Sequence, residues 1–229
     1  PGTGPMTVAA RRFGSDLLAT LPAWAVARLL VGVSWVVTHL VSDRLLEDAD
    51  RPSRADRGLM AWDADWYQSL VVHGYDAVPL EGVRFFPGFV LLGRLVDALL
   101  PGGPALALVV IANLGSLLAG VSLYRLVLAE TADHRLAERS VWLLACFPSS
   151  FVLVWGYAEG PFLAASIAMF LALRRQDWWS ASALGVAAAL LRPTGVLLVL
   201  PALLAAGANW RGCGVGEKLQ RFATIAAAP

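Results

Sequence analysis

Charged residues are scarce in this sequence: Asp, Glu, Lys and Arg make up 15% of its 229 residues, while 58% are hydrophobic. Soluble domains are typically about 25% charged and about 45–50% apolar. The mean hydropathy is +0.64, and the apolar residues gather in long blocks instead of short amphipathic periods. Together these features exclude an ordinary soluble domain and predict an integral membrane protein.

The sequence also has little excess charge of one sign, few cysteines and a single lysine. The net charge is +1, which argues against a nucleic-acid partner. Of the two cysteines, Cys146 lies in an apolar run and Cys213 in a polar segment, so we expect different depths and no disulfide between them. Lys218 is the only lysine, and a composition dominated by Arg, Ala, Leu and Gly is typical of a GC-rich bacterial genome.

Two uninterrupted apolar runs have the length of a membrane span. The first is predicted over Pro22–Val41, with Pro22 near the first turn, where its missing N–H costs little. The second is predicted over 104–128. Arg28 lies within the first run, and because a charge is expensive in lipid it is expected to face the bundle or a wet cavity.

The polar stretch 42–84 between these runs holds nine of the 17 acids, and we predict that it is an extracytoplasmic loop with short surface helices. The apolar stretch 85–100 follows, interrupted by Arg94 and Asp97. This stretch is too short and too charged to suit a full membrane crossing, so a membrane-surface or partly inserted helix is predicted.

Two further apolar blocks, 140–174 and 178–206, are interrupted. The first is broken at 147–148 and 155–161, and the second at 192–195. Each half has about fifteen residues, or roughly 22 Å of helix, which falls short of the hydrocarbon thickness of about 30 Å. Irregular backbone at this depth is tolerable only against protein or a wet cavity, so a cavity is expected there.

The placement of basic residues predicts the orientation. One alternation of spans puts the following in the cytoplasm: Arg11, Arg12, Arg125, Arg135, Arg139, Arg174, Arg175, Arg211, Lys218 and Arg221. The same alternation puts the 42–84 loop and the breaks at 155–161 and 192–195 together outside. The predicted fold is therefore all-α, a polytopic bundle in which residues 1–229 form one transmembrane domain. Another apolar segment begins at 226–229, so we expect a longer protein.

Asp63, Asp65, Glu159 and Arg192 converge on one face in this topology. Such a set suits transfer of a sugar from a lipid phosphate to a hydroxyl, because phosphate leaves without a general acid and one carboxylate can serve as base. Arg192, or a divalent cation such as Mg²⁺ or Mn²⁺, would neutralise the departing phosphate. Aromatic side chains could bind sugar and lipid at the interface, namely Trp62, Trp66, Tyr67 and Tyr157.

Each of these residues also has a structural interpretation. Asp63 could cap a helix over Ala64–His73 that Gly74 closes, while Asp65 would point to another side of that helix. Glu159 could lie in a solvated turn. Arg192 could extend to lipid headgroups.

Six short motifs resemble a known family. In order they are Trp62-Asp63-Ala64, His73-Gly74-Tyr75, Phe85-Phe86-Pro87, Phe147-Pro148-Ser149-Ser150, Gly156-Tyr157-Ala158-Glu159 and Leu191-Arg192-Pro193-Thr194-Gly195. They are similar to elements of the PIG-V-like mannosyltransferases, which are related to GPI mannosyltransferase II and belong to the GT-C glycosyltransferases.

The resemblance implies a GT-C-like bundle with a lumenal or periplasmic active site, here facing outward from a bacterial plasma membrane. It implies that Asp63 is the base, or orients the acceptor, and that the donor is a polyprenyl-phosphate mannose. The acceptor would be a lipid-linked, glycan or protein hydroxyl. Asp65 has no counterpart in the family, the chain has fewer spans than such enzymes usually carry, and Arg192-Pro193 replaces a commoner Arg-Ser.

Two other classes of function fit the same pattern. Short helices interrupted by Gly and Pro in paired blocks are typical of a transporter or flippase with a midplane site. The third hypothesis is a non-catalytic subunit that scaffolds an envelope-assembly complex. A transporter or flippase would have ionisable groups deep in its membrane spans, whereas most acids of this chain lie in one loop.

Overall fold

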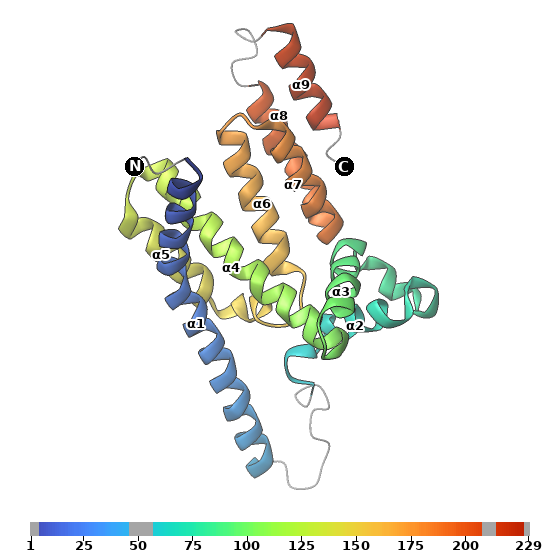
Figure 1. The fold of residues 1–229 in the computed structure, drawn as a ribbon. Helices are drawn as coiled ribbons and strands as arrows, with labels where there is room; N and C mark the ends of the chain where they lie inside the picture. The colour runs from blue at the N-terminus through green and yellow to red at the C-terminus, as the bar shows by residue number, and fades with distance from the viewer. Residues whose placement is uncertain (1–4, 46–56, 208–213, 227–229) are drawn as a thin grey trace.

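A computed structural model describes residues 5–45, 57–207 and 214–226, and this part of the chain is all-helical (Figure 1). The α-helices are α1 (Pro5–Leu45), α2 (Asp63–His73), α3 (Pro87–Leu99), α4 (Gly103–Thr131), α5 (His134–Cys146), α6 (Glu159–Arg174), α7 (Trp178–Leu191), α8 (Val199–Gly207) and α9 (Val215–Ala226). The 3-10 helices are η1 (Gly58–Met60), η2 (Tyr75–Ala77), η3 (Leu80–Arg84), η4 (Pro148–Leu153) and η5 (Pro193–Leu198).

Two helices are long and apolar enough to cross a membrane. The stretch Phe13–Ser42 of α1 has 30 residues and α4 has 29. The second half of α1 projects beyond the other helices in Figure 1, and it exposes apolar side chains such as Leu29 (66%) and Val33 (59%). Length, composition and this exposed apolar face indicate association with a membrane.

Pro22 lies inside α1, so its predicted place near the first turn was wrong. The apolar run marks only the part of the helix that suits lipid, whereas the helix itself begins at Pro5. Eight of the 17 residues from 5 to 21 are Ala, Leu or Arg, which are strong helix formers. An interior proline costs one backbone hydrogen bond, and membrane helices tolerate that loss when neighbouring groups re-satisfy the carbonyl.

The predicted interruptions are confirmed. The first block divides into α5, η4 and α6, and the second into α7, η5 and α8. With 16 and 14 residues, α6 and α7 are about 24 Å and 21 Å long. The apolar stretch that follows the polar loop forms the single short helix α3, as predicted.

The basic ends of the helices lie at one end of the bundle. Arg125 at the end of α4 forms an ion pair with Asp16 of α1 at 2.7 Å, and Arg174 at the end of α6 pairs with Glu130 of α4. Arg221 of α9 donates to Gln176, in the turn between α6 and α7, at 3.1 Å. The predicted grouping of cations is thus confirmed for these three arginines, while Arg211 lies outside the described residues.

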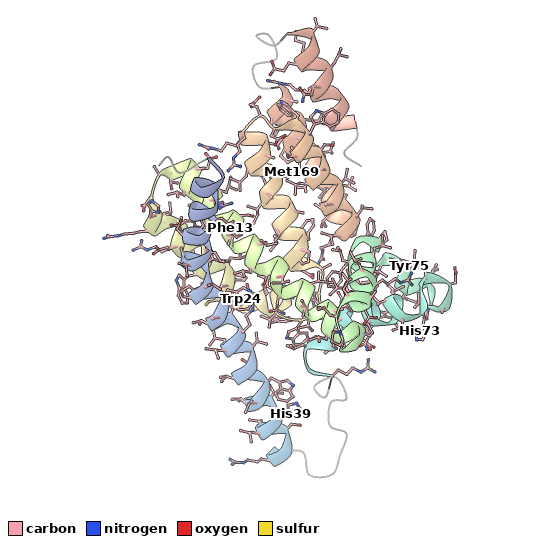
Figure 2. All side chains as sticks on the ribbon, viewed as in Figure 1. Phe13, Trp24, His39, His73, Tyr75 and Met169 are labelled. Atoms are coloured by element: carbon pink, nitrogen blue, oxygen red, sulfur yellow. The ribbon has the colours of Figure 1, made fainter. Side chains whose placement is uncertain are left out.

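The largest buried cluster joins α2 and α3 to the crossing of α4, α6 and α7. Its members are Tyr67, Leu70, Val71, Phe85, Phe89, Val90, Leu108, Ala112, Ala158, Ala165, Ala188 and Leu191. A second cluster around Met169 (labelled in Figure 2) packs α6 and α7 on α8. The polar loop therefore packs on the helical core through α2 and α3, next to the ends of α6 and α7.

Candidate functional site

Asp63 is the first residue of α2, and the prediction that it caps this helix was wrong. Trp62 occupies the N-cap position, and no side chain caps the helix there. The first turn is closed by the backbone, because Ala64 N–H donates to Ala61 C=O (3.4 Å) and Asp65 N–H to Trp62 C=O (3.1 Å). Among the described residues no group hydrogen-bonds or ion-pairs with the Asp63 carboxylate, which leaves it available to a ligand.

The two ends of α2 have special backbone conformations. Gly74 ends the helix with φ +80°, which confirms the predicted glycine stop. Trp62 begins it with φ +53° and ψ −116°, a conformation that costs a non-glycine residue on the order of 1–3 kcal/mol. Strain of this kind persists only where surrounding contacts hold the residue in place.

Asp65 already has a partner. Its carboxylate forms an ion pair with Arg57, and both side chains are about half exposed. Both acids lie in the first turn of α2, two positions apart, and that they face different sides stays a prediction. The structure does not bring Asp65 together with the other predicted site residues.

Three contacts join the segment before Asp63 to the turn before α6. Gly156 N–H donates to Leu59 C=O at 3.1 Å, and the Tyr157 hydroxyl donates to Ala61 C=O at 3.3 Å. The rings of Trp62 and Trp155 stack with centroids 5.1 Å apart. These contacts hold Trp62 in its strained conformation and place Asp63 beside Tyr157.

Tyr157 is buried, and burial raises the pKa of its hydroxyl to about 12, with the negative charge of Asp63 acting in the same direction. The phenol therefore stays protonated across the physiological range. It keeps its hydrogen bond to the Ala61 carbonyl, next to Asp63 in the chain.

Tyr67 of α2 is buried among aromatic side chains. Its ring packs edge-on against Phe85 and Phe89, with centroids 5.0 and 4.7 Å away. Burial raises the pKa of Tyr67, the positive charge of Arg192 opposes this rise, and the negative charge of Asp63 adds to it. Tyr67 shares one buried cluster with Ala158 and Leu191, so α2, the residue before Glu159 and the residue before Arg192 pack together.

Glu159 and Arg192 form an ion pair across the two interrupted blocks. Glu159 is the first residue of α6, and Arg192 ends α7 with extended backbone. Their side chains are 22% and 34% exposed. Glu159 is therefore not in a solvated turn, and Arg192 is engaged by a carboxylate instead of extending alone to headgroups.

Glycines allow these segments to approach each other. A Cβ added to Gly88, at the start of α3, would lie 2.6 Å from the Leu190 carbonyl oxygen of α7. At Gly160 it would meet the backbone of α4 at Ala112 and Ser116. The helix that follows the Phe85-Phe86-Pro87 motif is consequently packed directly against the helix end that carries Arg192.

A cavity of about 550 Å³ lies over the Glu159–Arg192 pair. Its polar lining is Glu159, Arg192, Ser149, Ser150 and Thr194, and its other walls are apolar. An ion pair and three hydroxyls among otherwise apolar walls suit an amphiphilic ligand with a polar head. Ser149 and Thr194 were not singled out from the sequence, although both lie within motifs that were.

An apolar groove of about 740 Å³ lies on the other side of η4. It runs between α1 and the aromatic side chains of Trp62, Phe151 and Trp155. Phe147 and Ser150 line both this groove and the cavity over Glu159 and Arg192. Asp63 lines neither space, but it follows Trp62 directly and so lies at the edge of the groove.

The described residues contain no group of three or more His, Cys, Asp or Glu side chains that could hold a metal ion. Mg²⁺ is commonly held by one or two carboxylates together with substrate phosphates. The involvement of Mg²⁺ or Mn²⁺ therefore stays a prediction.

Arg28 faces the bundle, as predicted. Its guanidinium stacks 4.1 Å over Trp24, which Figure 2 labels on α1, and donates to Asn113 of α4. Asn113 was missed in the sequence, where a lone amide inside an apolar run was the available signal.

Comparison of the chain with protein-family models, with curated proteins and with solved structures found no match.

Proposed function

We propose that this chain is part of a polytopic membrane glycosyltransferase that transfers a hexose, mannose, from a polyprenyl-phosphate donor to a hydroxyl acceptor. The single observation that carries the proposal is that the segment before Asp63, an acid without a partner among the described residues, is bonded to the turn that leads into the Glu159–Arg192 pair and its cavity. Membership of the PIG-V-like GT-C enzymes is part of the proposal and rests on the six motifs described above.

The reaction is a single displacement with inversion. Asp63 accepts the proton of the acceptor hydroxyl as its oxygen forms a bond to the anomeric carbon. The bond between that carbon and the phosphate oxygen breaks, and the electron pair leaves with the prenyl phosphate. Arg192 neutralises the charge that develops on the phosphate, with the hydroxyls of Ser149 and Thr194 nearby.

In this proposal the donor occupies both the cavity and the apolar groove. The phosphate occupies the cavity at Arg192, and the prenyl chain passes Phe147 and Ser150 into the apolar groove beside α1. We place the site on the extracytoplasmic side of a bacterial plasma membrane, because the basic helix ends lie at the opposite end of the bundle.

Asp63→Asn tests the proposal, with Asp65→Asn as the matched control. The carboxylate of Asp63 has no partner to lose among the described residues, so the variant should fold like the parent. Loss of a general base lowers the rate by about 10²–10⁴-fold. Asp65→Asn removes an exposed pair worth about 0–1 kcal/mol and should transfer sugar at nearly the parental rate. Parental activity in Asp63→Asn membranes would remove Asp63 from the reaction.

One observation favours a second function, a transporter or flippase of lipid-linked sugars. Gly160, the neighbour of Glu159, packs against α4 at Ala112, nine residues or about 14 Å into that helix. An ion pair at this depth between the ends of two short helices is typical of a midplane transport site. Movement of a labelled lipid-linked sugar across proteoliposomes without covalent transfer would favour this function over the enzyme.

A further inference from the structure

Arg28 is a charged residue in the middle of the apolar stretch of α1, and every acceptor that it contacts is neutral. Nε donates to the Asn113 side-chain oxygen at 2.8 Å, and Nη1 donates to Trp24 C=O at 3.0 Å. Nη2 donates to the Ser116 hydroxyl and, at 3.0 Å, to Leu153 C=O. No ion pair involves Arg28 in the part of the chain that the structure describes. Its charge is therefore solvated by protein dipoles.

The second element of this network is Asn113. Its side-chain N–H group donates to Val154 C=O at 2.8 Å as well as to Val109 C=O of its own helix. Trp24 N–H in turn donates to the Asn113 backbone carbonyl at 3.0 Å. Arg28 and Asn113 thus bind two consecutive carbonyls, Leu153 and Val154, at the end of η4.

Those two carbonyls need partners, because the last carbonyls of a helix have none within it. The chain turns sharply after them: Trp155 stacks on Trp62, Tyr157 reaches Ala61, and Glu159 begins α6 and pairs with Arg192. Every site residue on this segment follows Val154 by at most five positions. The network therefore holds the start of the segment that carries Tyr157 and Glu159.

We propose that Arg28 and Asn113 are positioning residues of the site, which fix the turn Trp155–Glu159 from α1 and α4. Lysine cannot replace Arg28 in this role. Its compact ammonium group lacks the planar fork that reaches Asn113, Ser116 and Leu153 at once. Leucine at position 113 would keep the size of the side chain and lose every contact that the amide makes.

Hydrogen exchange measured by mass spectrometry tests this proposal on the purified full chain. In Arg28→Lys and Asn113→Leu, the amide of Gly156, which bonds to Leu59, should exchange on the order of tenfold faster, as expected for loss of a hydrogen bond to a charged group. Amides in the middle of α6 should be unchanged. The matched control is Arg221→Met, which removes a buried arginine that also donates to a backbone carbonyl, that of Ala206, at the other end of the bundle.

Unchanged exchange at Gly156 in both variants, or an equal rise in the Arg221→Met control, would overturn the proposal. If neither variant accumulates, Ser116→Ala decides, because it removes one acceptor of Arg28 and leaves the guanidinium in place. That variant should speed exchange at Gly156 by a smaller factor, and parental exchange would again contradict the proposal.

The kinetic readout rests on the proposed function, whereas the exchange readout does not. If the chain transfers sugar, Arg28→Lys should lower kcat and leave KM for the prenyl-phosphate sugar unchanged, because Arg192 still binds the phosphate. A raised KM at constant kcat would contradict a positioning role. Absence of transfer in the parent as well would reject the proposed function and leave the exchange result to decide the role of Arg28.

Discussion

Gly88→Ala probes the contact on which the proposed site depends, the packing of α3 against the end of α7. An added Cβ would lie 2.6 Å from the Leu190 carbonyl oxygen and 2.8 Å from its carbonyl carbon. Both atoms belong to the backbone, so one of the two helices must move. Tyr67 packs on Phe89 of α3, and a shift of α3 would therefore move Tyr67 relative to Arg192.

The expected cost follows from these distances. Overpacking of this kind costs about 1–3 kcal/mol. At a site without a clash, the same change from glycine to alanine stabilises by about 0.4–1 kcal/mol. Gly32→Ala in α1 provides that control, because nothing lies within 4 Å of its added Cβ. Gly93→Ala should lie between the two, since its Cβ would meet only side-chain atoms of Val71 and Leu108.

The assay is thermal unfolding in detergent together with sugar transfer in membranes. Gly88→Ala should melt roughly 2–10 °C below the parent and lose transfer activity, and Gly32→Ala should melt at or above the parental temperature with full activity. If Gly88→Ala unfolds at the parental temperature and is fully active, α3 does not pack on the end of α7. The proximity of Asp63 and Arg192 then loses its support.

Two further predictions concern charge at the site. Glu159→Gln frees Arg192 from its carboxylate partner and should tighten binding of a prenyl phosphate by about three- to tenfold, since a partly exposed pair is worth about 1 kcal/mol. Glu130→Gln, which breaks the exposed pair with Arg174, is the control. Unchanged binding in Glu159→Gln would mean that the Glu159 carboxylate and the prenyl phosphate do not compete for Arg192. For Tyr157, burial raises the pKa above its ordinary value of 10 to about 12, so its contribution to stability is complete below pH 10 and is lost as the pH rises towards 12. Tyr157→Phe should flatten the fall in melting temperature between pH 9.5 and 11.5, and an identical fall in both proteins would contradict the burial of this hydroxyl.

The sequence was most informative about helices and their interruptions. Proline, glycine and polar residues within apolar runs predicted the breaks at η4 and η5, because these residues act on local backbone conformation. The start of α1 was mispredicted for a related reason. Apolar length reports where lipid is tolerated, and it does not report where helical hydrogen bonding ends.

The site was predicted less completely. Asp63, Tyr67, Tyr157, Glu159 and Arg192 were chosen from residue type and motif, and the structure brings them together around the ends of α2, α6 and α7. Asp65 was included only because it is a neighbouring acid, and its pairing with Arg57 depends on how the loop folds. Ser149 and Thr194 were missed, because a hydroxyl that lines a cavity has no local signature.

The sequence by itself determined that this chain is helical, apolar enough for a membrane and interrupted at specific residues, because hydrophobicity and backbone preference act over a few positions along the chain. The tertiary structure alone decided which polar groups find partners. In the part of the chain that the structure describes, it left the Asp63 carboxylate without a partner, joined Glu159 to Arg192, and brought Arg28 of α1 to the Leu153 carbonyl at the end of η4. Those outcomes depend on contacts between residues separated by 33 to 125 positions, and only the packing of the helices places such residues side by side.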